Sequence, residues 1–220
     1  MDKVSLKIAV VSDVVCPWCY IGKRRMEKAM LLAADKFDFE VEYFPFELNP
    51  HMTSGGADLK EYLCGKFGSE AKFYELMDHV KKVAKSEGLE FNLEAQKRYP
   101  NTRDIHRIIL FAREEAKQGE VVEGFFRGYF TEGADLTKFE TLLQIAENAG
   151  LDAGKVELLL QSNTGKLEIE MAEKGLQDLG ITSVPLFIIE NRFAISGAQP
   201  VEAFAKTFGQ ACEWAMVGNQ

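Results

Sequence analysis

The 220-residue chain predicts an α/β fold in which a large block of helices interrupts the sheet-forming sequence. Strand-like patterns occur only near the two ends of the chain, whereas the middle shows helical periods divided by Gly, Asn and Pro. Hydrophobic residues make up 46% of the chain, which suffices for a substantial core. We therefore expect a sheet domain built from residues 1–52 and 181–220, with an inserted helical domain at 53–180.

The first fifty residues predict a strand, a helix and a second strand. The expected strands, at 5–12 and 39–44, are rich in β-branched and aromatic residues. Between them, residues 16–34 place apolar side chains on one stripe and charged side chains elsewhere, as in a helix packed on a sheet. This order is the beginning of a βαβ unit.

The middle of the chain predicts helices only, and strands return near its end. The expected helices lie at 70–86, 102–118, 121–129, 138–149, 153–161 and 164–179. The pattern from Thr137 to Glu140 resembles a capping box that opens the fourth of them. Strands are expected at 186–189 and 193–195, joined by a hairpin turn at 190–192, before a closing helix at 201–214.

The tetrapeptide Cys16-Pro17-Trp18-Cys19 places two thiols one helical turn apart, directly after an apolar strand. A helix that begins near Cys16 sets its sulfur over unpaired backbone N–H groups, which favour the thiolate. Because the thiolate is the form that attacks disulfides, Cys16 is the candidate nucleophile and Cys19 the candidate resolving thiol. Cationic side chains in the next turn are expected to favour the thiolate further: Lys23, Arg24 and Arg25.

The cysteine pair has two other interpretations, a structural zinc site and a structural disulfide. A structural zinc site needs two more ligands, and the remaining cysteines, Cys64 and Cys212, are isolated in the sequence. A structural disulfide across so short a loop gains little chain entropy, and a reducing cytosol would keep it open. We expect redox or thiol chemistry and no metal site.

The second informative stretch is Val184-Pro185, where proline opens a strand that is expected to be central in the sheet. Proline cannot donate a hydrogen bond to a neighbouring strand, so its presence at the start of a central strand needs a structural explanation. A cis Val184–Pro185 bond beside Cys16 would leave the Val184 backbone free to pair with an extended substrate. The alternative is an ordinary trans proline at the start of a strand.

The charge and hydropathy of the chain argue against two classes of partner, nucleic acids and membranes. The net charge of −8 and pI near 5.1 argue against general nucleic-acid binding, which requires a basic surface. No apolar run approaches the roughly 20 residues that span a bilayer, so no membrane partner is expected. The N-terminal residues do not form a secretory signal pattern, and we expect a cytoplasmic protein.

Several motifs, taken in order along nearly the whole chain, resemble the DsbA group of the thioredoxin superfamily, and most closely its FrnE-like branch. They are SDVVCPWCYIGK at 12–23, PFELNP at 45–50, Asn101-Thr102, His106-Arg107, YFTEG at 129–133 and SGAQP at 196–200. The resemblance implies a thioredoxin fold with a large helical insertion, as in DsbA. It implies thiol–disulfide oxidoreductase or disulfide isomerase activity, with Cys16 and Cys19 as catalytic residues.

Further residues are candidates for the substrate cleft. Pro17, Trp18, Val184 and Pro185 belong to the two motifs, and Phe46 and Asn49 follow the second strand at the same sheet end. Asn101, Thr102 and His106 open a helix that the resemblance places in the lid. Simpler roles stay open for these residues: Phe46 in the core, Asn49 in a turn, Asn101 or Thr102 as a helix cap, and His106 as an ordinary histidine.

The expected partners are protein or small-molecule thiols and disulfides, without a tightly bound cofactor and with glutathione as candidate co-substrate. Related 2-hydroxychromene-2-carboxylate isomerases and kappa-class glutathione transferases use glutathione but carry Ser where Cys16 stands. A glutathione-dependent isomerase or transferase is therefore the alternative function, and a non-catalytic binding module or chaperone is a third. The chain is expected to be a monomer or a homodimer.

Overall fold

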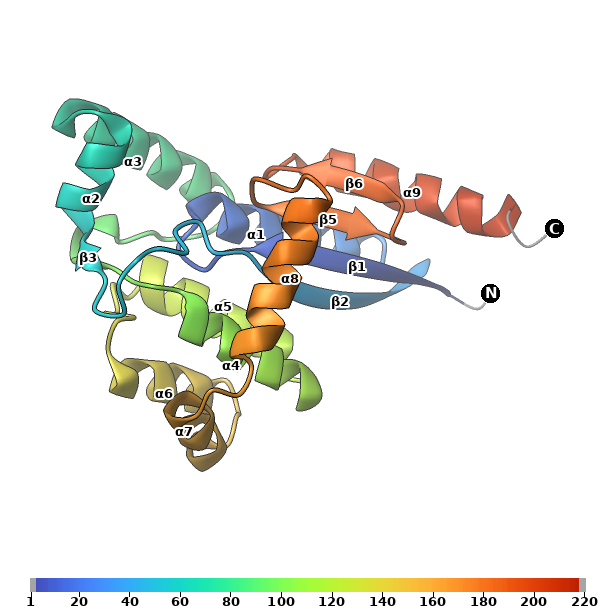
Figure 1. Cartoon of the computed structure of the whole chain (residues 1–220). Helices are drawn as coiled ribbons and strands as arrows, with labels where there is room; N and C mark the ends of the chain where they lie inside the picture. Colours follow the sequence, from blue (N-terminus) through green and yellow to red (C-terminus); the bar gives the residue numbers. More distant parts are fainter. Residues whose placement is uncertain (1–2, 218–220) are drawn as a thin grey trace.

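The computed structural model describes residues 3–217, which form a mixed four-stranded sheet with helices on both faces (Figure 1). The strand order is β2-β1-β5-β6. The strands are β1 (Val4–Ser12), β2 (Phe37–Pro45), β5 (Leu186–Ile189) and β6 (Phe193–Ser196). β1 runs parallel to β2 and antiparallel to β5, so the two ends of the chain build one sheet.

One face of the sheet is covered by α1 (Pro17–Leu32) and α9 (Val201–Val217), which also contact each other. The ring of Phe187 on β5 lies 4.9 Å from that of Phe204 on α9, and both side chains are fully buried. The turn between β5 and β6 has positive φ at Glu190 and Asn191, which suits a tight hairpin. The predicted hairpin is thereby confirmed.

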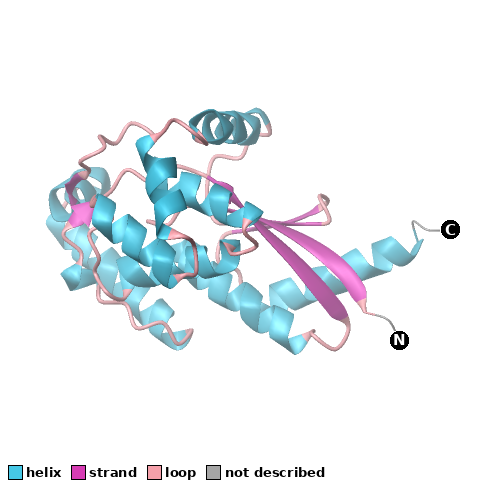
Figure 2. Cartoon of the chain, turned by 90° about the horizontal axis from the view of Figure 1, so that it is seen from below, coloured by secondary structure: helices cyan, strands magenta, loops and turns pink. Residues whose placement is uncertain are grey.

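The helical block packs against the other face and one end of the sheet (Figures 1 and 2). Its helices are α2 (Leu59–Phe67), α3 (Glu70–Ser86), α4 (Arg103–Glu114), α5 (Gln118–Phe130), α6 (Phe139–Asn148), α7 (Ala153–Gln161) and α8 (Lys166–Asp178), with a 3₁₀ turn at Leu93–Ala95. A small second sheet pairs β3 (Ala57–Asp58) with β4 (Arg98–Tyr99). Because α4, α5 and α8 contact β2, the block is anchored beside the edge strand.

The structure confirms the α/β class and most of the predicted elements. The small sheet of β3 and β4 was not expected in the helical block, and three further differences concern its helices. The helix expected at 102–118 ends at Glu114, because the chain turns at Ala116 with a φ of 53° before α5 begins. Helix α2 was not expected. The capping box was also wrong: Lys138 is the N-cap of α6, and the Thr137 hydroxyl bonds to Asp135 instead.

The four main strands lie within 1–52 and 181–220, whereas α2 to α8 lie within 53–180. The division of these segments into two separate domains stays a prediction. Across residues 3–217, no helix is both long enough and apolar enough to cross a membrane.

Candidate active site

Cys16 is positioned by a tight turn between β1 and α1. Its N–H donates to the carbonyl of Asp13 at 3.0 Å, and its own carbonyl accepts the N–H of Cys19 at 3.0 Å. Cys16 is thus the N-cap residue, in an extended conformation, and Pro17 takes the first helical position. Cys16 therefore lies at the start of α1, as predicted.

Cys19 lies one turn further into the helix and is only 2% exposed. Burial raises the pKa of the Cys19 thiol well above its ordinary value, and the neighbouring Cys16 raises it further. Both cysteines are free thiols. The two positions therefore differ chemically: the environment keeps Cys19 protonated while Cys16 occupies the helix terminus.

Val184 and Pro185 lie beside Cys16, although 168 positions separate Val184 from the cysteine in sequence. The peptide bond between them is cis, which confirms the predicted geometry. The sulfur of Cys16 is 4.0 Å from the carbonyl oxygen of Val184. The structure thus joins the two motifs at one end of the sheet.

The turn that precedes Cys16 contains a buried carboxylate, that of Asp13. Asp13 is fully buried, and its Oδ2 accepts the N–H of Leu48 at 2.7 Å. Nε2 of His106, a residue only 3% exposed, lies 3.5 Å from Oδ1 of Asp13. Asp13 therefore connects the turn before Cys16, the chain after β2 and helix α4, a role that the sequence analysis did not predict.

A second buried carboxylate continues this polar cluster. Oε1 of Glu47 accepts from Nε of Arg103 at 2.9 Å, and the N–H of Glu47 donates to Glu173 on α8 at 2.7 Å. Burial raises the pKa of Glu47 above its ordinary value, although Arg103 acts against this shift. The cluster joins the end of β2 to α4 and α8.

A cavity of about 300 Å³ opens beside the cysteine pair. Cys16, Pro17 and Trp18 lie along one side of it, and α2 and α3 supply much of the opposite wall. The ring centroids of Trp18 and His79 on α3 are 5.7 Å apart. The lining residues that the sequence analysis did not single out are Leu48, Leu59, Leu63, Lys66, Phe67, Leu76, Met77, Val80, Leu93, Gln96 and Tyr99.

The other predicted cleft residues occupy different places. Asn101 donates to the Met52 carbonyl at 2.7 Å, and its Oδ1 accepts the N–H of Arg103, the first residue of α4, at 2.9 Å, whereas the N-cap residue itself is Thr102. Thr102 is buried, as is His106. Phe46 and Asn49 are half-buried and do not line the described cavity, whereas the intervening Leu48 does.

The aromatic cluster on α5 belongs mainly to the core. Phe125 and Phe126 are fully buried. Tyr129 and Phe130, one turn further, are also buried but reach the cavity wall. Tyr129 and Phe130 therefore connect this part of the core to the cavity wall.

The three cations predicted to favour the Cys16 thiolate are engaged with carboxylates instead. Lys23 and Arg24 contact Glu123 on α5, and Arg25 pairs with Glu87 at 2.7 Å. Each of the three cations thus has a carboxylate partner. Their effect on the Cys16 thiolate stays a prediction.

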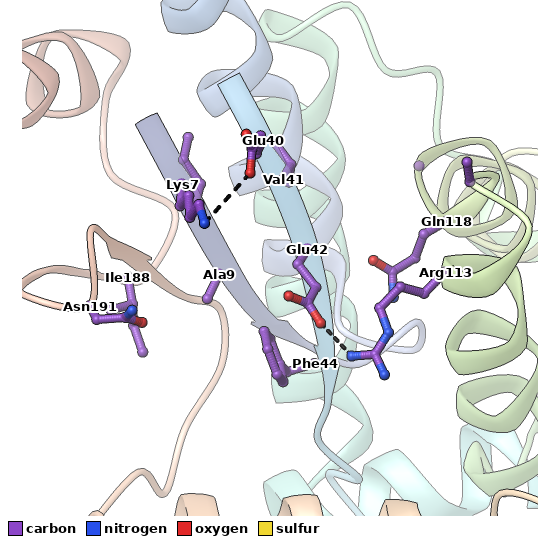
Figure 3. Close-up of a pocket in the computed structure, with 13 residues that line it drawn as sticks. Lys7, Ala9, Glu40, Val41, Glu42, Phe44, Arg113, Gln118, Ile188 and Asn191 are labelled. Atoms are coloured by element: carbon purple, nitrogen blue, oxygen red, sulfur yellow. Dashed lines mark hydrogen bonds and ion pairs between the residues drawn. The ribbon is translucent and has the colours of Figure 1, made fainter. Parts of the chain in front are cut away.

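A larger hollow lies on the sheet face and has a different character (Figure 3). It contains about 440 Å³ and carries two charged pairs, Lys7 with Glu40 at 3.9 Å and Arg113 with Glu42. None of its described lining residues is a cysteine or a histidine. Within residues 3–217, no group of three His, Cys, Asp or Glu side chains is arranged to hold a metal ion.

Comparison with known proteins agrees with this architecture. The family model described as a DSBA-like thioredoxin domain matches residues 7–209. The solved structure of a probable DsbA oxidoreductase from Streptomyces coelicolor is 31% identical, with a TM-score of 0.87, and the match covers 94% of this chain and 90% of that one. The uncharacterized protein YwbO of Bacillus subtilis is 28% identical over 92% of this chain and 96% of its own.

A more distant structure shares the fold alone. It is a 2-hydroxychromene-2-carboxylate isomerase, 16% identical, with a TM-score of 0.70 over 96% of this chain and 98% of that one. These similarities agree with the predicted FrnE-like DsbA resemblance. The match over residues 7–209, together with the sheet order and the paired cysteines at a helix start, shows that this chain belongs to the DSBA-like thioredoxin domain family.

Proposed function

We propose that the protein is a thiol–disulfide oxidoreductase or disulfide isomerase that acts through a mixed disulfide at Cys16. The observation that carries this proposal is the position of Cys16, at the start of α1 and 4.0 Å from the Val184 carbonyl, with Cys19 buried one turn later. Cys16 lies at the start of α1, where the helix dipole favours an attacking thiolate, while burial keeps the Cys19 thiol protonated until the second step. The family assignment supports the same chemistry.

The proposed reaction has two exchange steps. The Cys16 thiolate attacks one sulfur of a substrate disulfide, forms a mixed disulfide and releases the other sulfur as a thiolate. Cys19 then gives up its proton and attacks the Cys16 sulfur, which releases the second substrate thiolate and leaves a Cys16–Cys19 disulfide. The Cys19 proton ends on a released thiolate, and the two electrons that reduce the substrate come from the cysteine pair.

The same steps in reverse oxidise a substrate dithiol. The direction depends on how strongly the Cys16 thiolate is stabilised, since a more stable thiolate makes the pair a stronger oxidant. The backbone of Val184 is the candidate pairing site for an extended substrate beside Cys16. We further propose a cytoplasmic location, protein or small-molecule thiols and disulfides as partners, and no tightly bound cofactor.

The alternative is a glutathione-dependent isomerase or transferase in which Cys19 takes no part. The similarity to 2-hydroxychromene-2-carboxylate isomerase concerns the fold alone, and that family carries Ser at the position of Cys16. The second thiol, Cys19, one helical turn after Cys16 favours dithiol chemistry instead. We therefore place glutathione as a candidate reductant or co-substrate of the exchange reaction.

The test is equilibration of the wild-type protein with glutathione buffers of graded potential, followed by alkylation and mass spectrometry. We expect a two-electron transition between the dithiol and an intramolecular Cys16–Cys19 disulfide. The Cys19→Ser variant should instead collect glutathione on Cys16. Two results together would establish the alternative. The wild-type protein would form no Cys16–Cys19 disulfide, and the Cys19→Ser variant would retain a glutathione-dependent isomerase or transferase activity.

A further inference from the structure

Helix α8 carries apolar side chains on two opposite sides. Figure 1 shows it on the outside of the molecule, in front of β1 and β2. Its inner side buries Ile169 and Leu176, and the helix contacts α4 and β2. The outer side of a surface helix is normally polar, but on α8 a second apolar row faces the solvent.

The outer row consists of Leu167, Met171, Gly175 and Leu179, which we call the α8 ridge. These residues follow one another at intervals of four, so they form one continuous row on the helix surface. Leu167, Met171 and Leu179 are 64%, 65% and 76% exposed, and nothing lies within 4 Å of a Cβ added at Gly175. Single exposed apolar residues are common, but a contiguous apolar surface indicates a contact with another molecule.

We propose that the α8 ridge is the contact between two copies of this chain, packed antiparallel about a two-fold axis near Glu173. In this arrangement Leu167 of one copy lies opposite Leu179 of the other, because both are equally distant from the axis. Met171 lies opposite Gly175, where the missing side chain leaves room for the flexible methionine. This inference goes beyond the proposed exchange reaction and does not depend on it.

The charges beside the ridge favour a second copy of the same chain in this orientation. Lys166, Glu170, Lys174 and Asp178 also follow one another at intervals of four, so positive and negative charges alternate along the row. Antiparallel pairing brings Lys166 of one copy near Asp178 of the other, and Glu170 near Lys174. A parallel pairing would set each charge beside its own equivalent. Because complementary charges fix the orientation of partners, the row is self-complementary in the way that a two-fold interface requires.

These charged side chains are free to change partners. Lys174 pairs with Asp178 of the same chain at 2.8 Å, and Glu170 lies 3.7 Å from Arg103. The side chains of Glu170, Asp178 and Lys174 are 56%, 66% and 73% exposed, and exposed ion pairs are weak. An exchange of these partners for groups of a second copy therefore costs little.

The size of the ridge indicates the strength of the contact. One helix from each copy buries less than the roughly 1,600 Å² of a standard stable interface. We therefore expect a reversible dimer, with a dissociation constant of about 1–100 µM.

The test is sedimentation equilibrium of the wild-type protein at concentrations from about 1 to 300 µM, a range that spans the expected dissociation constant. Excess reductant is present throughout, so that disulfide-linked dimers cannot form. We expect a monomer at the lowest concentration and a growing fraction of dimer above it. A protein that stays monomeric over the whole range would overturn the inference.

Matched substitutions locate the interface. Met171→Lys should raise the dissociation constant at least about tenfold, because it replaces an apolar contact that the dimer makes twice. Leu31→Lys, at a 78% exposed position on α1, is the control on the other face of the sheet and should leave the constant unchanged. Should Met171→Lys fail to fold, Leu167→Lys takes its place. A dimer that neither ridge variant weakens, or that Leu31→Lys dissociates instead, would overturn the inference.

A charge reversal tests the antiparallel orientation. Lys174→Glu should weaken the dimer severalfold, because it sets two carboxylates beside each other at two equivalent places. Adding Glu170→Lys to the same chain restores opposite charges across the axis and should restore the wild-type dissociation constant. If Lys174→Glu has no effect, or if the double variant stays as weak as the single one, the antiparallel pairing is overturned.

Discussion

At the scale of single residues, the buried carboxylate of Asp13 organises the region behind the cysteine pair. It accepts a hydrogen bond from the backbone of Leu48 and lies 3.5 Å from His106 Nε2, so three segments distant in sequence meet at one side chain. Leu48 in turn lines the cavity. Asp13 thus supports both the turn that presents Cys16 and one wall of the cavity.

We predict that Asp13→Ala lowers the free energy of unfolding by about 1–3 kcal/mol, because it leaves the backbone N–H of Leu48 without its acceptor. Asp13→Asn keeps an acceptor for the Leu48 N–H and should cost less. Urea denaturation of both variants measures the effect. An Asp13→Ala protein within about 0.5 kcal/mol of the wild type would show that this contact contributes little.

The sequence predicted those site residues whose function can be inferred from a few neighbouring positions. Cys16 and Cys19 stand out because a helix start and a one-turn spacing can be recognised within a few positions. The role of Asp13 was missed, although one signal was present: an acidic residue inside the apolar run from Val10 to Val15. Its partners Leu48 and His106 could not be identified, because their approach depends on the packing of α4 against the end of β2.

At the scale of elements, the close approach of α1 to the start of β5 brings the two motifs together. Gly22 faces Pro185 and Phe187, and a Cβ added there would lie 2.9 Å from a ring carbon of Phe187 and 3.3 Å from Pro185. Because Phe187 is fully buried, its ring has little room to move. Gly22 therefore sets the distance between the cysteine helix and the Val184–Pro185 segment.

We predict that Gly22→Ala destabilises the protein by about 1–3 kcal/mol through overpacking, despite the better helix propensity of alanine. The control is Gly175→Ala in α8, where nothing lies within 4 Å of the added Cβ, and which should be neutral or stabilising by up to about 1 kcal/mol. Thermal unfolding compares the two variants. Equal effects at both positions would refute a special packing role for Gly22.

Element prediction succeeded where apolar periodicity was strong and failed where it was weak. The bounds of α3 and α7 agree with the prediction, whereas α2 is short and has few buried positions of its own. Since α2 supplies part of the cavity wall, the cavity could not be predicted either. The predicted capping box failed for a similar reason. The Thr137 hydroxyl donates to the nearby Asp135 carboxylate and does not cap α6.

At the scale of the whole molecule, α1 connects the sheet with the helical block. The ring of Tyr20 stacks on Phe126 of α5 at 4.9 Å, and its hydroxyl donates to Glu123 at 2.7 Å. Lys23, almost completely buried, donates to the same carboxylate. These long-range pairs give the cations of α1 partners that the sequence could not identify.

Glu123 gives the connection a defined pH dependence. Burial opposes ionisation of this carboxyl, but Lys23 and Arg24 outweigh it and hold its pKa below the ordinary value. A carboxyl with a lowered folded pKa stabilises the protein above its unfolded pKa of about 4.3, and that stabilisation is lost as the pH falls through the folded pKa.

We predict that Glu123→Gln lowers the free energy of unfolding by about 1–3 kcal/mol at pH 7. The difference from the wild type should fade as the pH falls below about 4, because the wild-type carboxyl then becomes protonated as well. Denaturant unfolding across this range, with the exposed Glu90→Gln as control, measures it. A difference that stays constant with pH would exclude the ionised pair as its cause.

The central claim is that Cys16 attacks and Cys19 resolves. It is tested most directly by incubating the Cys16→Ser and Cys19→Ser variants with a disulfide substrate and locating the trapped adduct by peptide mass spectrometry. The account predicts a stable mixed disulfide at Cys16 in the Cys19→Ser variant and no adduct at Cys19 in the Cys16→Ser variant, since Cys19 is 2% exposed and held as a thiol. An adduct found on Cys19 would contradict it.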